Sequence, residues 1–479
     1  MKAENIERFL QMLQPTRLRN SSVQKDETDG RTPFDSDFSR VALSAAVRRL
    51  QDKTQVFPLA DFDFVRNRLT HSLEVMTMAR GLGLGVEKML IKEGVDLINR
   101  NIDDPMRNAI SKILEVASLV HDLGNPPFGH KGEKSVQKYF RKTQGFVAQN
   151  VQSDLLNDIE RKDLQNIEGN VQGFRILCHL ALADDDYSYN LTCPVLSTII
   201  KYPFSSVDGN KKTDNPFTKK FGFLQSEVER YNLICHKLGL YMGQRHPLTY
   251  LLEAADDITY NACDLEDGFR NGAISIQEIK NHLTPENVGN NEKIIEYVNE
   301  LKEENSTLHN ELFMQKLRIA IQSEMIIACT KEFIANIDSI IEGTYKKSLI
   351  EATHYCNLCE SLGKLDICNF NSTDVKSKED EGINKMIYLL DGYSKAMILL
   401  HEGSDTFSPE FQLYQTISPN YRKVACKAIH KVPMTLYEKL LLVTDYMFGM
   451  TDSFVIKMYE NEEIKELILR VKSKIDNLK

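Results

Sequence analysis

Residues 121–133 have the sequence His121-Asp-Leu-Gly-Asn-Pro-Pro-Phe-Gly-His130-Lys-Gly-Glu133. A nearly continuous apolar run, residues 113–120, precedes this stretch and predicts a buried helix. A buried helix does not end in an imidazole and a carboxylate unless another charge compensates them. The simplest compensation is a divalent cation, and imidazole with carboxylate suits Mn, Fe, Zn or Mg. Because neighbours on a helix point roughly 100° apart, the remaining ligands must come from elsewhere in the chain.

Two distant segments offer the missing ligands. His71 lies where apolar residues between positions 69 and 78 predict the start of an amphipathic helix. Asp256 lies in a second helical segment, in which Asp256, Tyr260 and Asp264 recur every four residues and share one face. Asp257 competes for the role of ligand, but helical phase favours Asp256. The sequence therefore predicts a metal site with open coordination positions, as a hydrolytic site requires, made of His71, His121, Asp122 and Asp256.

The second half of residues 121–133 contains a candidate acid–base pair. His130 and Glu133 are three residues apart, so they share a face if a helix begins here, and the carboxylate can orient the imidazole and raise its pKa. Pro126, Pro127 and Gly129 break the preceding helix and direct His130 back over the metal. The alternative is a helix N-terminus with an incidental Glu, which does not explain the histidine. We expect His130 and Glu133 to be catalytic residues.

The periodicity of the whole chain predicts an all-α protein. The 479 residues contain no Pro-, Gly- or Ser-rich linker, which favours one large body over separate domains on a flexible chain. Apolar residues between positions 294 and 333 recur at helical spacing, and alternating short strands are absent from the pattern. Residues 1–30 are polar and predict a lead-in without regular structure. The charged segment Ser372–Gly382 predicts a surface loop.

Composition and net charge limit the cellular compartment and the kinds of partner that we expect for this chain. No apolar run approaches the roughly 18 to 20 residues that a membrane helix needs, and the charged N-terminus lacks the apolar stretch of a signal peptide. Nine scattered cysteines fit a reducing compartment. We therefore expect a cytoplasmic protein without a membrane partner. The net charge of −9 argues against a protein that mainly coats nucleic acid.

Two local clusters allow more than one interpretation. Cys356 and Cys359 follow His354, but a second tight pair is missing, so helix packing is favoured over a zinc site. Four lysines gather in the segment 207–223, which predicts a loop. They favour a solvated charged surface, with contact to phosphate of a substrate or a polynucleotide as the alternative; they are Lys211, Lys212, Lys219 and Lys220.

Beyond these local patterns, the chain resembles the HD-domain phosphohydrolases, and within them the deoxyguanosine triphosphate triphosphohydrolases (dGTPases). The matches keep their order from residue 31 to residue 452 and cover most of the chain. They comprise Arg48–Pro58, Asn67–Val75, His121–Glu133, Glu168–Arg175, Lys201–Pro203, Lys220–Phe223, Glu253–Tyr260, Asp264–Gly268 and Asp445–Asp452. The resemblance implies an HD-type catalytic core at 31–275, after the lead-in at 1–30, and a helical C-terminal part at 276–479 packed on that core.

The same resemblance implies a reaction and a set of contacts. A divalent cation, Mn, Mg or Fe with Co or Zn as further candidates, would support water attack at the α-phosphorus of a deoxynucleoside triphosphate (dNTP). The products would be the deoxynucleoside and inorganic triphosphate. His130 is expected to protonate the leaving 5′ oxygen, with activation of water as the other possibility. The implied phosphate contacts are Arg68, Lys201 and Tyr202, and the implied sugar contacts are Gln55, Tyr260 and Asp264.

Partners and alternatives also follow from the resemblance. It makes dGTP the leading substrate, with broad dNTP use as a competitor. It implies a homo-oligomer, a tetramer or hexamer, and single-stranded DNA or a dNTP as candidate effectors. Two other functions compete: an HD phosphohydrolase acting on nucleoside monophosphates or cyclic nucleotides, and a non-catalytic nucleotide- or DNA-binding sensor.

Overall fold

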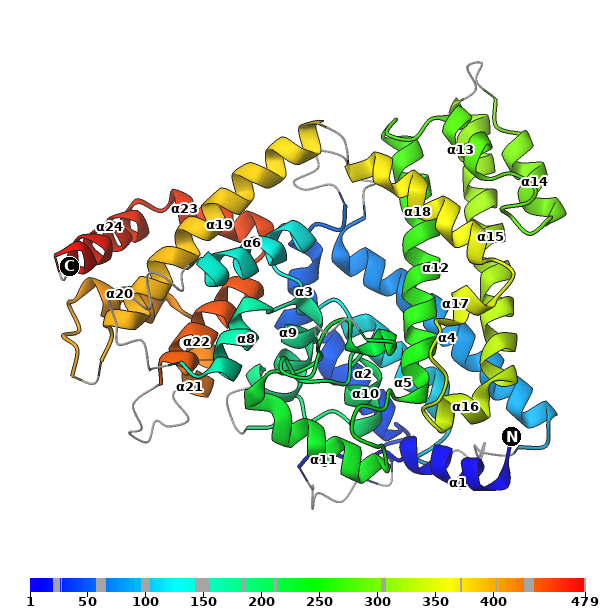
Figure 1. The fold of residues 1–479 in the computed structure, drawn as a ribbon, viewed down its shortest axis with the longest axis horizontal. Helices are drawn as coiled ribbons and strands as arrows, with labels where there is room; N and C mark the ends of the chain where they lie inside the picture. The colour runs from blue at the N-terminus through cyan, green and yellow to red at the C-terminus, as the bar shows by residue number, and fades with distance from the viewer. Residues whose placement is uncertain are drawn as a thin grey trace.

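The computed structural model is built from helices joined by loops (Figure 1). It describes residues 1–19, 26, 28–56, 66–95, 104–142, 156–181, 186–209, 213–302, 307–370, 373–401, 403–425 and 435–477. Within these residues no β-sheet forms, and only isolated bridges such as Thr54 to Asn67 pair extended backbone. The all-α prediction is confirmed.

The first part of the chain supplies α1 to α12. These helices are α1 (Ala3–Met12), α2 (Pro33–Ala42), α3 (Ala45–Arg49), α4 (Arg68–Lys92), α5 (Ala109–Val120), α6 (Gly129–Lys142), α8 (Asp158–Gln165), α9 (Gly169–Arg175), α10 (Cys193–Thr198), α11 (Val228–Leu238) and α12 (Pro247–Arg270). Short 3-10 turns occur at Leu50–Asp52, Pro216–Thr218 and Gln225–Glu227, and a π-helical turn at Ile176–Leu180 continues α9.

The later part supplies α13 to α24. These helices are α13 (Ile276–His282), α14 (Glu292–Asn299), α15 (Thr307–Ala335), α16 (Ile337–Ile341), α17 (Leu349–Ala352), α18 (Cys356–Phe370), α19 (Thr373–Leu399), α20 (Pro409–Thr416), α21 (Pro419–Ala425), α22 (Leu436–Gly449), α23 (Asp452–Glu460) and α24 (Glu462–Asp476).

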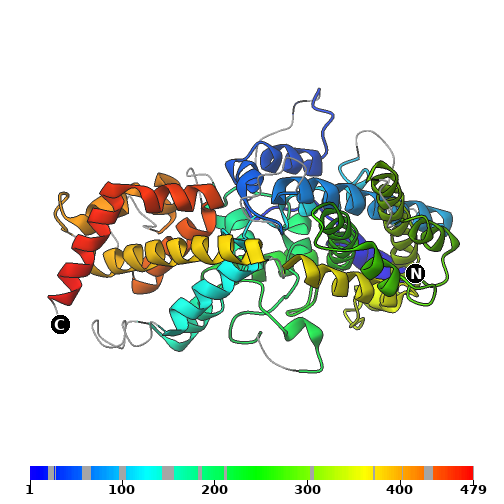
Figure 2. The same cartoon turned by 90° about the horizontal axis from the view of Figure 1, so that it is seen from above.

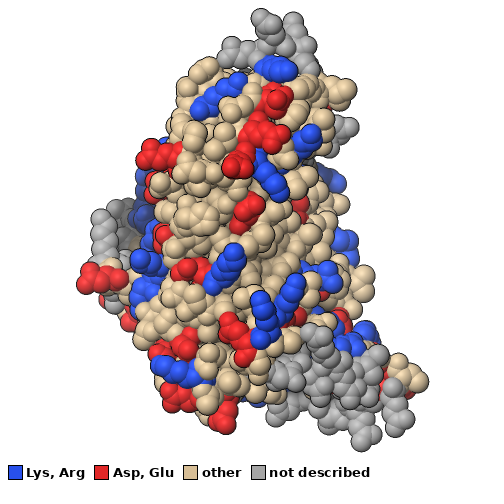
Figure 3. All heavy atoms as spheres, turned by 90° about the vertical axis from the view of Figure 1, so that its right-hand side faces the viewer, with Lys and Arg blue, Asp and Glu red and all other residues tan. Residues whose placement is uncertain are grey.

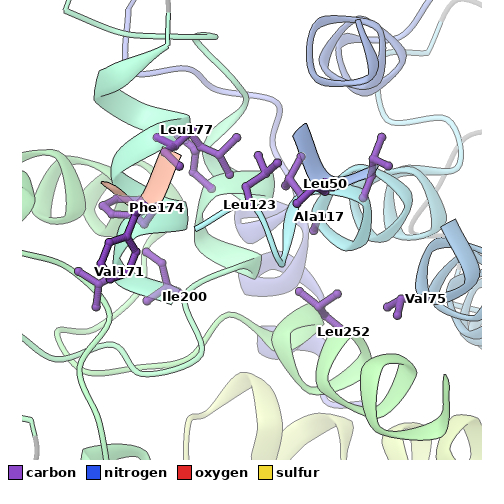
Figure 4. Close-up of a cluster of buried hydrophobic side chains, with 14 of the residues drawn as sticks. Leu50, Val75, Ala117, Leu123, Val171, Phe174, Leu177, Ile200 and Leu252 are labelled. Carbon is purple, nitrogen blue, oxygen red and sulfur yellow. The ribbon is translucent and has the colours of Figure 1, made fainter. Parts of the chain in front are cut away.

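The centre of the molecule is formed by α4, α5 and α12, which pack against one another. Helix α5 is apolar almost all round, and ten of its twelve residues are buried, because helices cover it on several sides. Figure 4 shows part of this core, where side chains from separate segments meet: Leu50, Val75, Ala117, Leu123, Val171, Phe174, Leu177, Ile200 and Leu252. This rigid centre carries the three segments that hold the predicted metal ligands.

Two groups of helices lie on either side of this centre. Helices α15 and α18 pack on α12, and α15 also touches α4. On the opposite side, α19 contacts α6 and then α20, α22, α23 and α24, and Figure 2 shows it extending from the middle of the molecule toward the C-terminal end. Residues after 275 therefore flank the centre on both sides in Figure 1.

Two predictions of irregular structure are wrong. Residues 3–12 form α1, whose Phe9 and Met12 are buried, so the first part of the predicted lead-in is a packed element. Residues 373–382 are the first turns of α19, not a loop. Their charges suit a helix with one outer face: Glu381 pairs with Lys385 one turn later at 2.8 Å, and the buried Glu379 pairs with Lys131 of α6.

The described surface mixes both signs of charge. On the face drawn in Figure 3, basic and acidic side chains are interspersed among uncharged ones. None of the described helices is long and apolar enough to cross a bilayer. Cys356 lies at the start of α18 and Cys359 one turn later. The metal-ligand group found among the described residues lies elsewhere, so packing of these cysteines remains the favoured interpretation.

Candidate metal and active site

Helix α4 places His71 at the centre of the molecule. Asn67 caps the helix, with its side chain accepting from Thr70 N at 3.0 Å and Thr70 Oγ1 accepting from Asn67 N at 3.0 Å. This capping box makes α4 begin at Arg68, so Arg68 and His71 lie in the first turn, three residues apart on one face. Both side chains are buried.

The end of α5 fixes the orientation of His121. Its Nδ1 lies 2.6 Å from the carbonyl oxygen of Ser118, which can only accept, so Nδ1 carries the hydrogen in this contact. In the neutral ring the lone pair is then on Nε2. That atom is buried and makes no hydrogen bond to any described residue. A histidine with this arrangement is suited to bind a cation through Nε2.

Asp256 of α12 completes a compact group with the two histidines. One potential ligand atom from each of His71, His121 and Asp256 lies within 4.8 Å of the others. Asp256 Oδ1 is 3.2 Å from His71 Nε2 and 3.4 Å from His121 Nε2. The group contains Asp256 and not Asp257, in agreement with the helical phase.

Asp122 lies at the edge of this group. Its Oδ1 is 3.7 Å from His121 Nε2 and accepts from Asn125 Nδ2 at 2.5 Å, and its Oδ2 accepts from Arg68 Nη1 at 2.6 Å. Each carboxylate oxygen has a second lone pair, so these bonds orient Asp122 and leave it able to bind a cation.

The electrostatics of the group favour a cation. Burial opposes protonation of His121, but the carboxylates of Asp122 and Asp256 outweigh it and raise the pKa of His121 to about 9. Burial would raise the pKa of Asp256, but the imidazoles of His121 and His71 hold it well below its usual range. The two carboxylates therefore stay ionised at neutral pH, and a metal cation would compete with the proton for Nε2 of His121. Two imidazole nitrogens with carboxylate oxygens fit a divalent transition metal or Mg²⁺.

The loop after α5 delivers His130 and Glu133 to the same region. Phe128 (φ 59°) and Gly129 (φ 57°) are both left-handed, which reverses the chain before α6. A Cβ on Gly129 would also lie only 3.1 Å from Arg68 Nη2, so the loop passes close over Arg68. His130 Nδ1 lies 3.3 Å from Glu133 Oε1, and Glu133 Oε2 accepts from Gly169 N at 3.0 Å. The expected dyad is therefore present in α6.

His130 and Glu133 differ in their exposure to solvent. Glu133 is buried, whereas the His130 side chain is 63% exposed. Partial burial of the ring, together with the cations Lys220, Lys134 and Arg68, outweighs the charge of Glu133 and lowers the pKa of His130. Glu133 itself raises the pKa of His130, as predicted, but the net shift is downward because partial burial and the three cations outweigh its charge.

Two of the predicted phosphate contacts, Arg68 and Lys201, lie beside the metal group. The pocket beside the metal group is lined in part by Lys201, His121 and Asp256. Lys201 Nζ is held 3.1 Å from Glu253 Oε1, and the same carboxylate binds Arg245 Nη2 at 2.9 Å. Burial would lower the pKa of Lys201, but Glu253 and other acids raise it above its usual value, so Lys201 stays cationic.

The predicted sugar contacts lie along α12 and in the segment before α4. Tyr260 and Asp264 follow Asp256 by one and two turns, and Asp264 is buried. The Tyr260 hydroxyl donates to Asp366 Oδ2 of α18. Gln55 Oε1 is buried and makes no hydrogen bond to the described part of the chain. The role of Gln55 in sugar binding stays a prediction.

Comparison with known proteins adds to this geometry. The model of the HD domain matches residues 68–182. A deoxyguanosinetriphosphate triphosphohydrolase-like protein of Listeria monocytogenes is 36% identical over 94% of this chain and 98% of its own length. The chain belongs to the dGTPase family. A deoxyguanosinetriphosphate triphosphohydrolase of Salmonella arizonae is 31% identical over 92% of this chain and 96% of its own length. The resemblance and the assignment to the HD hydrolases are confirmed.

The groups that orient the predicted metal ligands at this dGTPase-family site were missed by reasoning from the sequence. Asn125 and the Ser118 carbonyl orient the predicted ligands Asp122 and His121. Lys220 lies 2.7 Å from the buried Glu168, and its Nζ is 6.0 Å from the centre of the Tyr202 ring. Lys220 therefore contacts the predicted site, whereas Lys211 and Lys212 of the same cluster lie outside the described residues. The motif Lys220–Phe223 was the signal that could have separated Lys220 from its neighbours.

Proposed function

We propose that this protein is a metal-dependent dNTP triphosphohydrolase that converts dGTP to deoxyguanosine and inorganic triphosphate. The observation that carries the proposal is the convergence of His71, His121 and Asp256 within 4.8 Å, next to Asp122, in a chain of the dGTPase family. Three chain segments far apart in sequence supply these groups. Two ionised carboxylates beside two imidazoles are difficult to explain as a structural element alone.

The proposed cation is Mn²⁺, Mg²⁺ or Fe²⁺, with Co²⁺ or Zn²⁺ as further candidates, held by His71, His121, Asp122 and Asp256. Such a cation, when bound, polarises the α-phosphate and lowers the pKa of a water molecule. Arg68, Lys201 and Tyr202 would bind the phosphates, and the ion pair of Lys201 with Glu253 keeps its ammonium charged and aimed along the pocket. The positive charges of Arg68 and Lys201 would compensate the charge of the triphosphate.

His130 would donate a proton to the leaving 5′ oxygen, because it is partly exposed and close to the ligand-bearing loop. Glu133 would keep the ring oriented through its contact with Nδ1, which leaves Nε2 for the substrate. Water adds to the α-phosphorus, the bond to the 5′ oxygen breaks, and the proton from His130 completes the deoxynucleoside. Tyr260, Asp264 and Gln55 would bind the sugar, with the Tyr260 ring beside C2′, where a ribose carries its extra hydroxyl.

A direct assay tests this function. Purified protein is incubated with each of the four dNTPs and with Mg²⁺, Mn²⁺, Fe²⁺, Co²⁺ or Zn²⁺, and the products are separated by ion-exchange chromatography. We expect deoxynucleoside and tripolyphosphate in equal amounts, with dGTP consumed fastest. Release of pyrophosphate with a nucleoside monophosphate, or no turnover with any combination of dNTP and cation, would overturn the proposal.

Sedimentation of the same preparation tests the proposed tetramer or hexamer. Addition of single-stranded DNA or of a dNTP to the assay tests the proposed effectors.

A further inference from the structure

The Tyr260 side chain is anchored by a helix other than its own. Tyr260 belongs to α12, but its hydroxyl donates to Asp366 Oδ2 of α18, 106 residues later. Asp366 is buried, and α18 packs along α12. A tyrosine fixed only at its Cα can turn about two side-chain torsions. Here the ring is held at both ends, by the backbone of α12 and by a carboxylate on α18.

The surroundings preserve this hydrogen bond. Burial, with the nearby carboxylates Asp264 and Asp366, raises the pKa of Tyr260 above its usual value, so the phenol keeps its hydrogen and stays a donor. Asp366 Oδ2 is an acceptor within a mostly buried site, where a hydrogen bond involving a charged group is stronger than at the surface. Moving the ring would break this bond and lose its free energy.

We propose that Asp366 is a positioning residue that makes this site select deoxyribose over ribose. The inference rests on the proposed function, in which the Tyr260 ring lies beside C2′ of the substrate. A ring that is free to turn would move aside for a 2′-hydroxyl at a small cost in free energy. A ring bonded to Asp366 gives way only by losing that bond, so the hydrogen bond adds its free energy to the rejection of ribonucleotides.

The test compares kcat/KM for dGTP and for GTP in four proteins: wild type, Tyr260→Phe, Asp366→Ala and the double variant. We expect each single variant to lower the preference for dGTP about tenfold, the order expected when one hydrogen bond to a charged group is lost. We expect the double variant to lose no more than either single one, because both remove the same bond. Most of the change should come from improved use of GTP.

Two further variants separate positioning from general loosening. Asp366→Asn keeps an oxygen that can accept from the Tyr260 hydroxyl, so it should restore most of the preference. Ser361→Ala removes another buried polar group of α18 and should leave the preference unchanged. Thermal melts report folding for every variant. If Asp366→Ala does not fold, Tyr260→Phe and Asp366→Asn still give opposite expectations.

The outcomes for the two proposals are distinct. Wild-type protein that hydrolyses no dNTP overturns the proposed function. Wild-type protein that hydrolyses dGTP, with an unchanged preference over GTP in folded Tyr260→Phe and in Asp366→Ala, overturns the role of Asp366 alone. Additive losses in the double variant would also contradict it, because the two residues would then act separately.

Discussion

Two hydrogen bonds on the far side of the metal group determine how His121 and Asp122 can act. Ser118 O accepts from His121 Nδ1, so that in the neutral ring the lone pair is on Nε2, and Asn125 Nδ2 donates to Asp122 Oδ1. Arg68 binds the other oxygen of Asp122. These hydrogen bonds orient the predicted ligand atoms within the protein itself. Each ligand residue can be tested by a single substitution.

Replacing His121 by Ala should abolish both cation binding and hydrolysis. Loss of groups that only orient metal ligands costs about 10- to 100-fold in affinity or activity, so loss of a ligand should cost at least about 100-fold in kcat. Isothermal titration with Mn²⁺ and the dGTP assay measure the two effects. His236→Ala, which removes an exposed histidine of α11, is the control and should match wild type. Normal Mn²⁺ affinity in His121→Ala would contradict the predicted site.

Replacing His130 by Ala should lower kcat by about 10² to 10⁴, the usual contribution of a positioned acid or base. Cation binding should remain, because His130 lies outside the compact group of ligand atoms. The dGTP assay and Mn²⁺ titration on one preparation measure both. Activity near that of wild type would remove His130 from the mechanism.

Replacing Glu133 by Gln should move the pH profile in a stated direction. Burial and nearby cations already lower the pKa of His130, and the negative charge of Glu133 opposes them. Without that charge the pKa of His130 falls further. If His130 acts as the acid, kcat is lost as pH rises through its pKa, so the alkaline limb should shift to lower pH. The kcat–pH profile for dGTP measures this shift, with Glu229→Gln on α11 as control. A shift to higher pH would refute the acid role.

At the scale of elements, the loop between α5 and α6 is held by the C-terminal helices. Asp452, the first residue of α23, accepts from Phe128 N at 3.0 Å, from Thr54 N at 3.0 Å and from Thr54 Oγ1. The buried Lys53 Nζ donates to Asn125 O at 2.5 Å and to Phe448 O at 2.7 Å. These contacts maintain the left-handed Phe128, which would otherwise be disfavoured.

Asp452→Ala should therefore lower both stability and turnover. It removes a buried carboxylate that satisfies three donors, which should cost about 3 kcal/mol. The dGTP kcat should fall more than the affinity for Mn²⁺, because the loop that carries His130 is released while His71 and Asp256 stay in place. Thermal melts and the dGTP assay measure both effects. Ser453→Ala, at the neighbouring position, is the control. An unchanged melting temperature would mean that the loop does not depend on α23.

The sequence was sufficient to predict the helices that carry the candidate site residues. It failed where a run of charged residues was compatible with more than one structure. The apolar α5, the start of α4 and the spacing of Asp256, Tyr260 and Asp264 are local signals, and all three segments are helical. Residues 373–382 were misassigned because a dense charge run is compatible with both a loop and a helix with a solvated face. The partners Asp366 and Asp452 could not be found, because contacts across 100 to 400 residues leave no local pattern.

At the scale of the whole molecule, a buried ion network joins the HD segment to the C-terminal helices. Arg175 at the end of α9 donates from Nη2 to Asp445 Oδ2 of α22 at 2.9 Å and from Nη1 to Glu227 Oε1 at 2.5 Å. Gln172 Nε2 also donates to Asp445, at 2.7 Å. All of these side chains are buried. The residues after 275 are thus tied to the segment that carries the predicted ligands.

Asp445→Ala should destabilise the protein strongly, by about 3 to 5 kcal/mol, because it leaves the buried Arg175 with one carboxylate where it had two. Denaturant unfolding measures the change. Asp158→Ala is the matched comparison, since Asp158 pairs with Arg161 at an exposed position, and its effect should be small. Equal effects for the two variants would mean that the network does not hold the molecule together.

The central claim is that a cation held by His71, His121, Asp122 and Asp256 supports water attack at the α-phosphorus of a dNTP. The measurement that tests it most directly is mass spectrometry of the products of dGTP and Mn²⁺ in water enriched in ¹⁸O. We predict one heavy oxygen in the inorganic triphosphate and none in the deoxyguanosine. Heavy oxygen in the deoxyguanosine, or dGMP or dGDP among the products, would contradict it.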